Sequence, residues 1–183
     1  MHGKHLNLAL LMVLGFYGLS SYGVVVTPSP VVGLMQQPTS QYYHSVYGGY
    51  LDLRTDDAKL IFRLSYIERP EFEAAGYSDQ ETAAFGLLGT TVVENKLWRM
   101  TTYIGGGQVE GYTKALNKNE DSPDRSFKLR GVTFELEINA TIAKRLEVGL
   151  SHLSHIGWVD EKQLNSYVAW PYNFFMLRMG LAI

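Results

Sequence analysis

The chain of 183 residues has no cysteine and only six prolines. Without cysteine it can hold no disulfide scaffold, no thiolate metal site and no cysteine nucleophile. The chain also lacks an excess of charge of either sign, because it has 16 basic and 18 acidic residues. This balance gives no reason to expect a nucleic-acid partner. Tyrosine (12), phenylalanine (8) and glycine (18) are plentiful. That composition favours strands joined by tight turns.

Long hydrophobic runs are scarce, and the one clear example lies near the start, at residues 6–19. His2, Lys4 and His5 precede it, and the small residues Ser21 and Gly23 follow it. This pattern predicts a secretory signal over residues 1–23 and a single domain over 24–183. The alternative, a membrane anchor, would need about 20 apolar residues. No later run is long enough for a transmembrane helix, so a mature chain that spans a membrane must do so as a closed barrel.

Period-two alternation of apolar and polar residues predicts eight strands. Tight turns follow the second, fourth and sixth strands, whereas a dozen or more residues follow the third, fifth and seventh. An even strand count with short turns at one end and long loops at the other is typical of bacterial outer-membrane barrels. The expected strands are residues 31–35, 43–54, 58–68, 82–94, 97–113, 126–138, 144–156 and 173–183.

The alternation also predicts which side chains face the lumen. If the apolar faces meet lipid, charged residues of both signs gather inside. An eight-stranded barrel is too narrow for a channel, so these charges should form a packed, mutually neutralising plug. We therefore predict an all-β protein, an eight-stranded antiparallel up-and-down transmembrane β-barrel of the bacterial outer membrane. The expected lumen residues are Lys59, Arg63, Arg99, Arg178, Asp52, Glu135, Glu137 and Glu147.

The alternative architecture is a soluble lipocalin-like barrel whose apolar faces surround a ligand. A strand that ends on the last residue, and the lack of a Gly-x-Trp signal near the first strand, count against it. The last eleven residues, 173–183, would rise about 25 Å if tilted by about 45°, which matches the apolar band of an outer-membrane barrel. Aromatic residues near the strand ends fit an interfacial belt: Tyr42, Tyr43, Tyr47, Trp98, Trp158, Trp170 and Tyr172.

Two polar residues, His152 and Ser154, continue the apolar face of the seventh strand. Residues two apart on a strand point the same way, so the imidazole can reach the hydroxyl. A histidine beside a serine is the minimum for general-base activation, and a third group must orient the ring. Asn173, at the start of the last strand, would lie across from this pair and supply that group.

These residues resemble the outer-membrane lipid A 3-O-deacylases, eight-stranded barrels with a His-x-Ser pair near the outer end of the seventh strand and an acid at the start of the last. The match covers residues 152–157 and 171–173, within about the last 40 residues. It implies that Ser154 attacks an acyl ester of lipid A, with His152 as the base. Two positions depart from the family pattern, because His155 stands where asparagine is common and Asn173 stands at the acid position. Asp160 or Glu161, in the preceding loop, is a candidate for the missing charge.

No cofactor and no metal is expected. His152 and His155 have an H-x-x-H spacing, but residues three apart on a strand face opposite sides. The glycines at 105–107 and 111 do not fit G-x-G-x-x-G, and we expect them to relieve crowding in a strand. Two function hypotheses remain. The first is a serine esterase, a carboxylic ester hydrolase, with membrane lipid A as its partner. The second is a non-catalytic structural or adhesive barrel.

Overall fold

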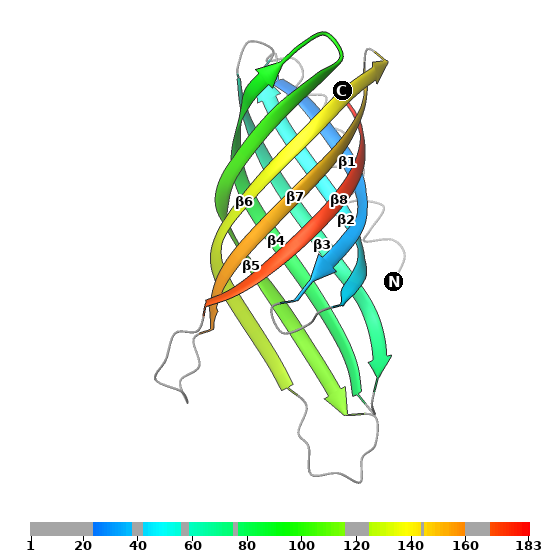
Figure 1. Ribbon diagram of the computed structural model, residues 1–183, viewed down its shortest axis with the longest axis vertical. Helices are drawn as coiled ribbons and strands as arrows, with labels where there is room; N and C mark the ends of the chain where they lie inside the picture. The colour runs from blue at the N-terminus through cyan, green and yellow to red at the C-terminus, as the bar shows by residue number, and fades with distance from the viewer. Residues whose placement is uncertain are drawn as a thin grey trace, which may run out of the picture.

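The computed structural model describes residues 24–37, 42–55, 59–74, 77–115, 125–143, 145–159 and 169–183. They form a closed antiparallel barrel in which each strand pairs with the next and β8 pairs with β1 (Figure 1). The predicted fold class is therefore confirmed. The expected signal, residues 1–23, lies outside the described residues. The strands are β1 (Val24–Gln36), β2 (Tyr43–Thr55), β3 (Leu60–Ala74), β4 (Tyr77–Glu94), β5 (Trp98–Ala115), β6 (Arg125–Ala143), β7 (Leu146–Val159) and β8 (Ala169–Leu181).

Several strands are longer than the sequence predicts. The stretch 69–80, expected to be a loop, belongs almost entirely to β3 and β4, so the long connection predicted after the third strand is wrong. β3 to β6 continue past the other strands at the lower end of Figure 1. Glu71, Phe72 and Glu73 are all exposed in this extension. Because both of its faces can meet water, apolar alternation does not reveal it.

β1 begins at Val24, seven residues before the predicted start. The sequence does not predict residues 24–30 as a strand because this segment contains Pro28 and Pro30, and proline cannot donate a hydrogen bond to a neighbouring strand. The ladder between β1 and β8 joins Val31–Gln36 to residues 173–178, and both prolines lie beyond it. At the two prolines themselves β1 therefore pairs with β2 alone.

The two ends of the barrel differ. At one end the start of β1 meets Ile183, where the Val26 amide donates to the Ile183 carbonyl at 3.2 Å. The tight β4–β5 turn lies at the same end, with the amides of Leu97 and Trp98 donating to Asn95 Oδ1 at 2.8 and 3.0 Å. In outer-membrane barrels short turns face the periplasm and longer connections face the outside. The opposite end, here called the loop end, is thus the outer one.

The exterior of the barrel is apolar over most of its height. Outward side chains of neighbouring strands form continuous exposed rows, which suit contact with lipid and would be costly in water. No helix among the described residues has the length and hydropathy to cross a membrane. The exposed apolar residues include Val32, Leu34, Phe62, Leu64, Leu88, Ile104, Phe134, Leu136, Ile138, Leu150, Phe175, Leu177 and Met179.

The half of the interior toward the turns is an ion-pair network centred on Arg63 and Arg178. Arg63 contacts Asp52 at 2.7 Å and Glu135 at 2.8 Å, and its second terminal nitrogen contacts Glu137 at 2.7 Å. Arg178 reaches Glu137 at 2.9 Å. Buried charges are tolerated when they are paired and hydrogen-bonded in this way. Arg99 and Arg54 both join the network through Glu147.

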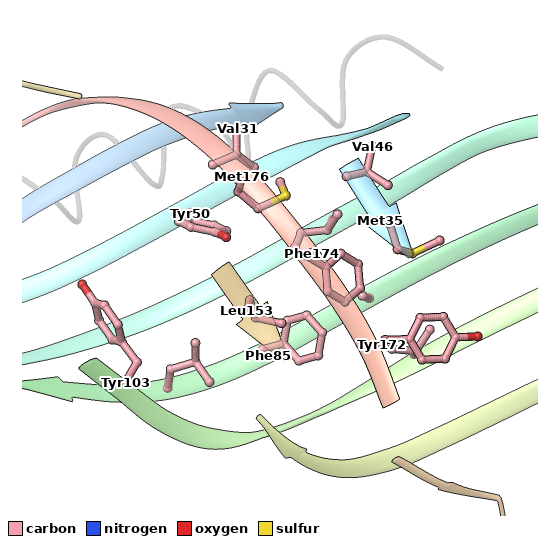
Figure 2. Packing of buried hydrophobic residues seen from close by; sticks show 14 of the residues in the cluster. Val31, Met35, Val46, Tyr50, Phe85, Tyr103, Leu153, Tyr172, Phe174 and Met176 are labelled. Carbon is pink, nitrogen blue, oxygen red and sulfur yellow. The ribbon is translucent and has the colours of Figure 1, made fainter. Parts of the chain in front are cut away.

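The predicted plug is thus present, with two corrections. Lys59 is exposed rather than in the lumen, because β3 begins at Leu60, two residues later than predicted, and leaves Lys59 in the preceding turn, where water solvates its ammonium group. Arg54 was not predicted and supplies a further cation. Charges also fill only part of the lumen. An apolar layer follows toward the loop end, where Phe85, Leu153 and Phe174 lie together with Tyr172 beyond them (Figure 2). A second buried ion pair, between Arg69 and Glu81 at 3.4 Å, lies nearer that end.

The glycines differ in what surrounds them. A Cβ added at Gly107 would overlap the Ala84 carbonyl oxygen and the Phe85 ring, whereas one at Gly86 would meet only Leu64 at 3.9 Å. The expectation that glycines in β5 relieve crowding holds for Gly105, Gly107 and Gly111, whereas a Cβ at Gly106 would come no nearer than 3.3 Å to its closest neighbour. We predict that Gly107→Ala destabilises the barrel by about 1–3 kcal/mol, and that Gly86→Ala changes stability by less than about 0.5 kcal/mol. Urea unfolding in detergent micelles, followed by tryptophan fluorescence, measures both, and equal midpoints would contradict the prediction.

Candidate active site

Strand alternation places His152 and Ser154 on the outer face of β7. Leu150 and Ile156 share that face, whereas Leu153 and His155 are buried in the interior. The predicted orientation is therefore correct. β7 pairs with β8 so that Ser154 lies opposite Asn173 and His152 lies opposite Phe175. This register brings all three predicted site residues together on the lipid-facing surface.

The hydrogen bonds within the site differ from the prediction. The distance from Ser154 Oγ to His152 Nε2 is 3.5 Å, at the outer limit of a hydrogen bond. The Ser154 hydroxyl donates instead to Asn173 Oδ1, at 2.8 Å. Within the described part of the chain, no hydrogen bond joins Asn173 to His152. Asn173 therefore holds the serine, and the expected role of orienting the imidazole is not what this geometry gives it.

An aromatic ring orients His152. The imidazole stacks on Phe175 with ring centroids 4.6 Å apart and planes 16° apart. Tyr43 of β2 packs edge-on against the other side of this cluster, 6.0 Å from the Phe175 ring. Sequence reasoning missed Phe175 because its role depends on the register between β7 and β8. The sequence offers one indication of this role: Phe175 lies two residues after Asn173 and therefore faces the same side of β8.

On β7 the pair lies on the turn side of the belt residue Trp158. Trp158 is exposed on the same face of β7, four residues nearer the loop end. At 3.4 Å per residue the separation is about 14 Å along the strand, or about 10 Å along the barrel axis for a strand tilted by about 45°. Ser154 thus lies about 10 Å nearer the turn end than Trp158, while Tyr43, also a predicted belt residue, packs against Phe175 beside the pair.

An apolar groove of about 830 Å³ crosses the barrel exterior beside the pair. Leu34, Phe175, His152 and Leu136 form one wall, and Val32, Leu177, Leu150 and Ile138 form the other. These are successive rows of outward side chains, with Gly33 and Met176 between them. His152 lines the groove, and Ser154 lies on the next row toward the loop end. Its apolar lining suits an acyl chain.

Most of the predicted belt residues are exposed, including Tyr42, Tyr43, Tyr47, Trp98 and Trp158. Tyr172 does not belong to the belt, contrary to the prediction. Its side chain is 1% exposed and stacks on Phe174 inside the barrel, because it has the inward parity of β8. Nothing is described of the Trp170 side chain or of the acid candidates Asp160 and Glu161, which lie outside the described residues.

The nearby His155 does not share a site with His152. His155 points inward, away from His152, and its Nδ1 lies 2.9 Å from the Thr133 hydroxyl. Among the described residues no group of three or more histidine, aspartate or glutamate side chains is arranged to hold a metal ion. The chemistry available at the site is that of a hydroxyl, an imidazole and an amide.

Comparison with known proteins identifies the fold. Neither a protein-family model nor a curated protein sequence matches the chain. Among solved structures, Ail, the attachment invasion locus protein of Yersinia pestis, superposes with a TM-score of 0.63 at 9% identity, over 87% of this chain and 97% of Ail. The outer membrane protein OprG from Pseudomonas aeruginosa gives 0.59 at 8% identity, over 88% and 96%. Neisserial surface protein A gives 0.55 at 9% identity, over 87% and 96%.

These identities are low, so the likeness concerns the fold alone. It agrees with the exposed apolar exterior, the buried ion pairs and the aromatic residues at the strand ends. Together these features place the barrel in the bacterial outer membrane, as the sequence predicts. The chain has the fold of the eight-stranded barrels of that membrane.

Proposed function

We propose that the barrel is a serine esterase that removes an acyl chain from lipid A in the outer leaflet. One observation carries the proposal: the Ser154 hydroxyl and the His152 imidazole lie 3.5 Å apart on the lipid-facing surface, beside an apolar groove. A nucleophile for a membrane-embedded ester has to face the membrane. The resemblance to the lipid A 3-O-deacylases supports the same substrate class.

The reaction follows from the groups present. The Ser154 hydroxyl turns from Asn173 toward His152, and Nε2 takes its proton as Oγ attacks the ester carbonyl carbon. When the carbon–oxygen bond of the ester breaks, the imidazolium returns the proton to the leaving alkoxide, and an acyl group remains on Oγ. Water, deprotonated by His152, then hydrolyses this acyl-enzyme and releases the fatty acid. Stacking on Phe175 keeps the imidazole plane fixed throughout.

The test is mass spectrometry of lipid A from cells that express the wild type, Ser154→Ala or an empty vector. We expect loss of one acyl chain with the wild type and none with Ser154→Ala, because alanine has no hydroxyl to form the acyl-enzyme. Ser151→Ala is the matched control, since Ser151 lies on the same strand and faces the interior. Both variants must show heat-modifiable gel mobility, which reports a folded barrel. Identical lipid A from the wild type and the empty vector would remove the esterase proposal.

The second candidate is a non-catalytic structural or adhesive barrel, and a specific observation favours it. The serine proton is directed to Asn173, and within the described residues no carboxylate contacts His152. An amide cannot stabilise the imidazolium that forms during catalysis. In this case His152, Ser154 and Asn173 are a polar cluster at the barrel surface, and the lipid A measurement gives the same spectrum for every strain.

A further inference from the structure

A second hollow lies on the outer face of the barrel, centred on β3 and β4. Its volume is about 930 Å³, and it is separate from the groove beside His152. Leu51, Leu64 and Tyr66 form its apolar sides. Gln108 and Arg130 line it where β5 and β6 approach the loop end.

The hollow exists because β2 and β4, the two neighbours of β3, carry small residues at outward positions. Gly49, Ala84 and Gly86 take the places where other strands present leucine or phenylalanine. Close approach of backbones does not require these outward glycines. A Cβ would meet nothing nearer than 3.9 Å at Gly86 and 3.8 Å at Gly49. The barrel therefore leaves open a space that larger residues could fill without strain.

Arg130 borders this space with no charge partner. Its side chain is exposed, and no hydrogen bond or ion pair joins it to the rest of the described chain. Lys128, two residues away on the same face, forms an ion pair with Glu110. An unpaired guanidinium beside an apolar surface is costly unless a ligand or the solvent satisfies it.

The height of Arg130 matches that of lipid headgroups. It lies opposite the belt residue Trp158 in the β6–β7 register. Toward the turns, the outward residues of β6 are the apolar Val132, Phe134, Leu136 and Ile138. Toward the loop end the charged pair Lys128 and Glu110 follows. Arg130 thus marks the boundary between the apolar band and the polar rim of the barrel.

We propose that this hollow is a binding site for an acyl lipid with an anionic phosphate headgroup. One acyl chain lies along the small residues between Leu64 and Tyr66, and the Arg130 guanidinium binds the phosphate through two parallel N–H donors. The hollow shares no lining residue with the groove beside His152. It holds a lipid without changing it.

Lipid binding to the purified barrel in detergent micelles tests the proposal, with native mass spectrometry as the readout. The probes share the same acyl chains: phosphatidylglycerol, which carries an anionic phosphate, and diacylglycerol, which carries none. We expect phosphatidylglycerol to bind about tenfold more tightly, the effect of one hydrogen-bonded charge pair. Arg130→Gln should remove this preference and leave diacylglycerol binding unchanged. Gly86→Leu should weaken both lipids by about tenfold, because leucine fills the space that the chain would occupy.

Matched controls separate the site from general lipid adhesion. Lys128→Gln removes a nearby cation that is already paired, and Thr90→Leu adds the same side chain at an exposed position of β4 outside the hollow. Both should behave as the wild type. The proposal is overturned if Arg130→Gln matches Lys128→Gln, or if Gly86→Leu matches Thr90→Leu. It is also overturned if inorganic phosphate at the concentration of the lipid abolishes binding, since Arg130 would then hold a free anion.

Discussion

Replacing Arg63 with methionine should destabilise the barrel by about 3–5 kcal/mol, the usual effect of removing one partner from a buried ion pair. The Arg63 side chain is 0% exposed and contacts Asp52, Glu135 and Glu137. Its guanidinium also lies over the rings of Tyr50 and Tyr103, at 4.5 and 4.1 Å from their centroids. Methionine fills a similar volume but leaves Glu135 with no cation in ion-pair contact among the described residues.

The matched control is Lys128→Met, which breaks the exposed ion pair with Glu110 and should change stability by less than about 1 kcal/mol. Adding Glu135→Gln to Arg63→Met should recover part of the loss, because the uncompensated carboxylate is then gone. Urea unfolding in detergent micelles and heat-modifiable gel mobility measure all three variants. Equal effects of Arg63→Met and Lys128→Met would show that the network contributes little to the fold.

Replacing Asn173 with glutamate should raise the rate of ester hydrolysis at least about tenfold, if Ser154 is the nucleophile, because proton transfer by a correctly oriented base contributes on the order of 10²- to 10⁴-fold. Asn173 binds Ser154 and leaves His152 without a charged partner. A glutamate is one methylene longer, so its carboxylate can reach the imidazole and stabilise the imidazolium. It also frees the serine hydroxyl for His152.

Gln36→Glu is the control for this change. Gln36 pairs with Asn173 across β1 and β8, so the new charge lies in the same row, one strand farther from His152. Hydrolysis of a chromogenic acyl ester, measured against pH, should increase for Asn173→Glu alone and vanish when Ser154→Ala is added. An equal response of the two glutamate variants would mean that the position of Asn173 relative to His152 has no special importance.

The architecture could be predicted from the sequence because lipid and lumen impose opposite chemistry on alternate residues. Arg63 and Arg178 stand among the alternate residues of their strands that face the interior. Their charges indicate, from the sequence alone, which face of each strand lines the lumen. The failures occur where that contrast disappears. The extension of β3 and β4 meets water on both faces, and the first half of β1 contains prolines that only an interrupted ladder tolerates.

The candidate site could be predicted in part for the same reason. Parity alone placed His152 and Ser154 side by side facing outward. The partner of each side chain could not be derived, because it depends on the β7–β8 register and on rotamers. This is why Asn173 was assigned to the imidazole although it binds the serine, and why Phe175 was missed.

The strand order has a consequence for how lipids exchange around the barrel. In a closed ring of eight, β3 and β4 lie half a circumference from β7 and β8. Arg130, however, belongs to β6 and pairs with Trp158 of β7, four residues from Ser154, so a headgroup bound at Arg130 lies beside the candidate site while its acyl chain extends away toward β3 and β4. A lipid resident at Arg130 therefore borders the place where a transient lipid would reach Ser154, and the two are neighbours in the annulus around the barrel.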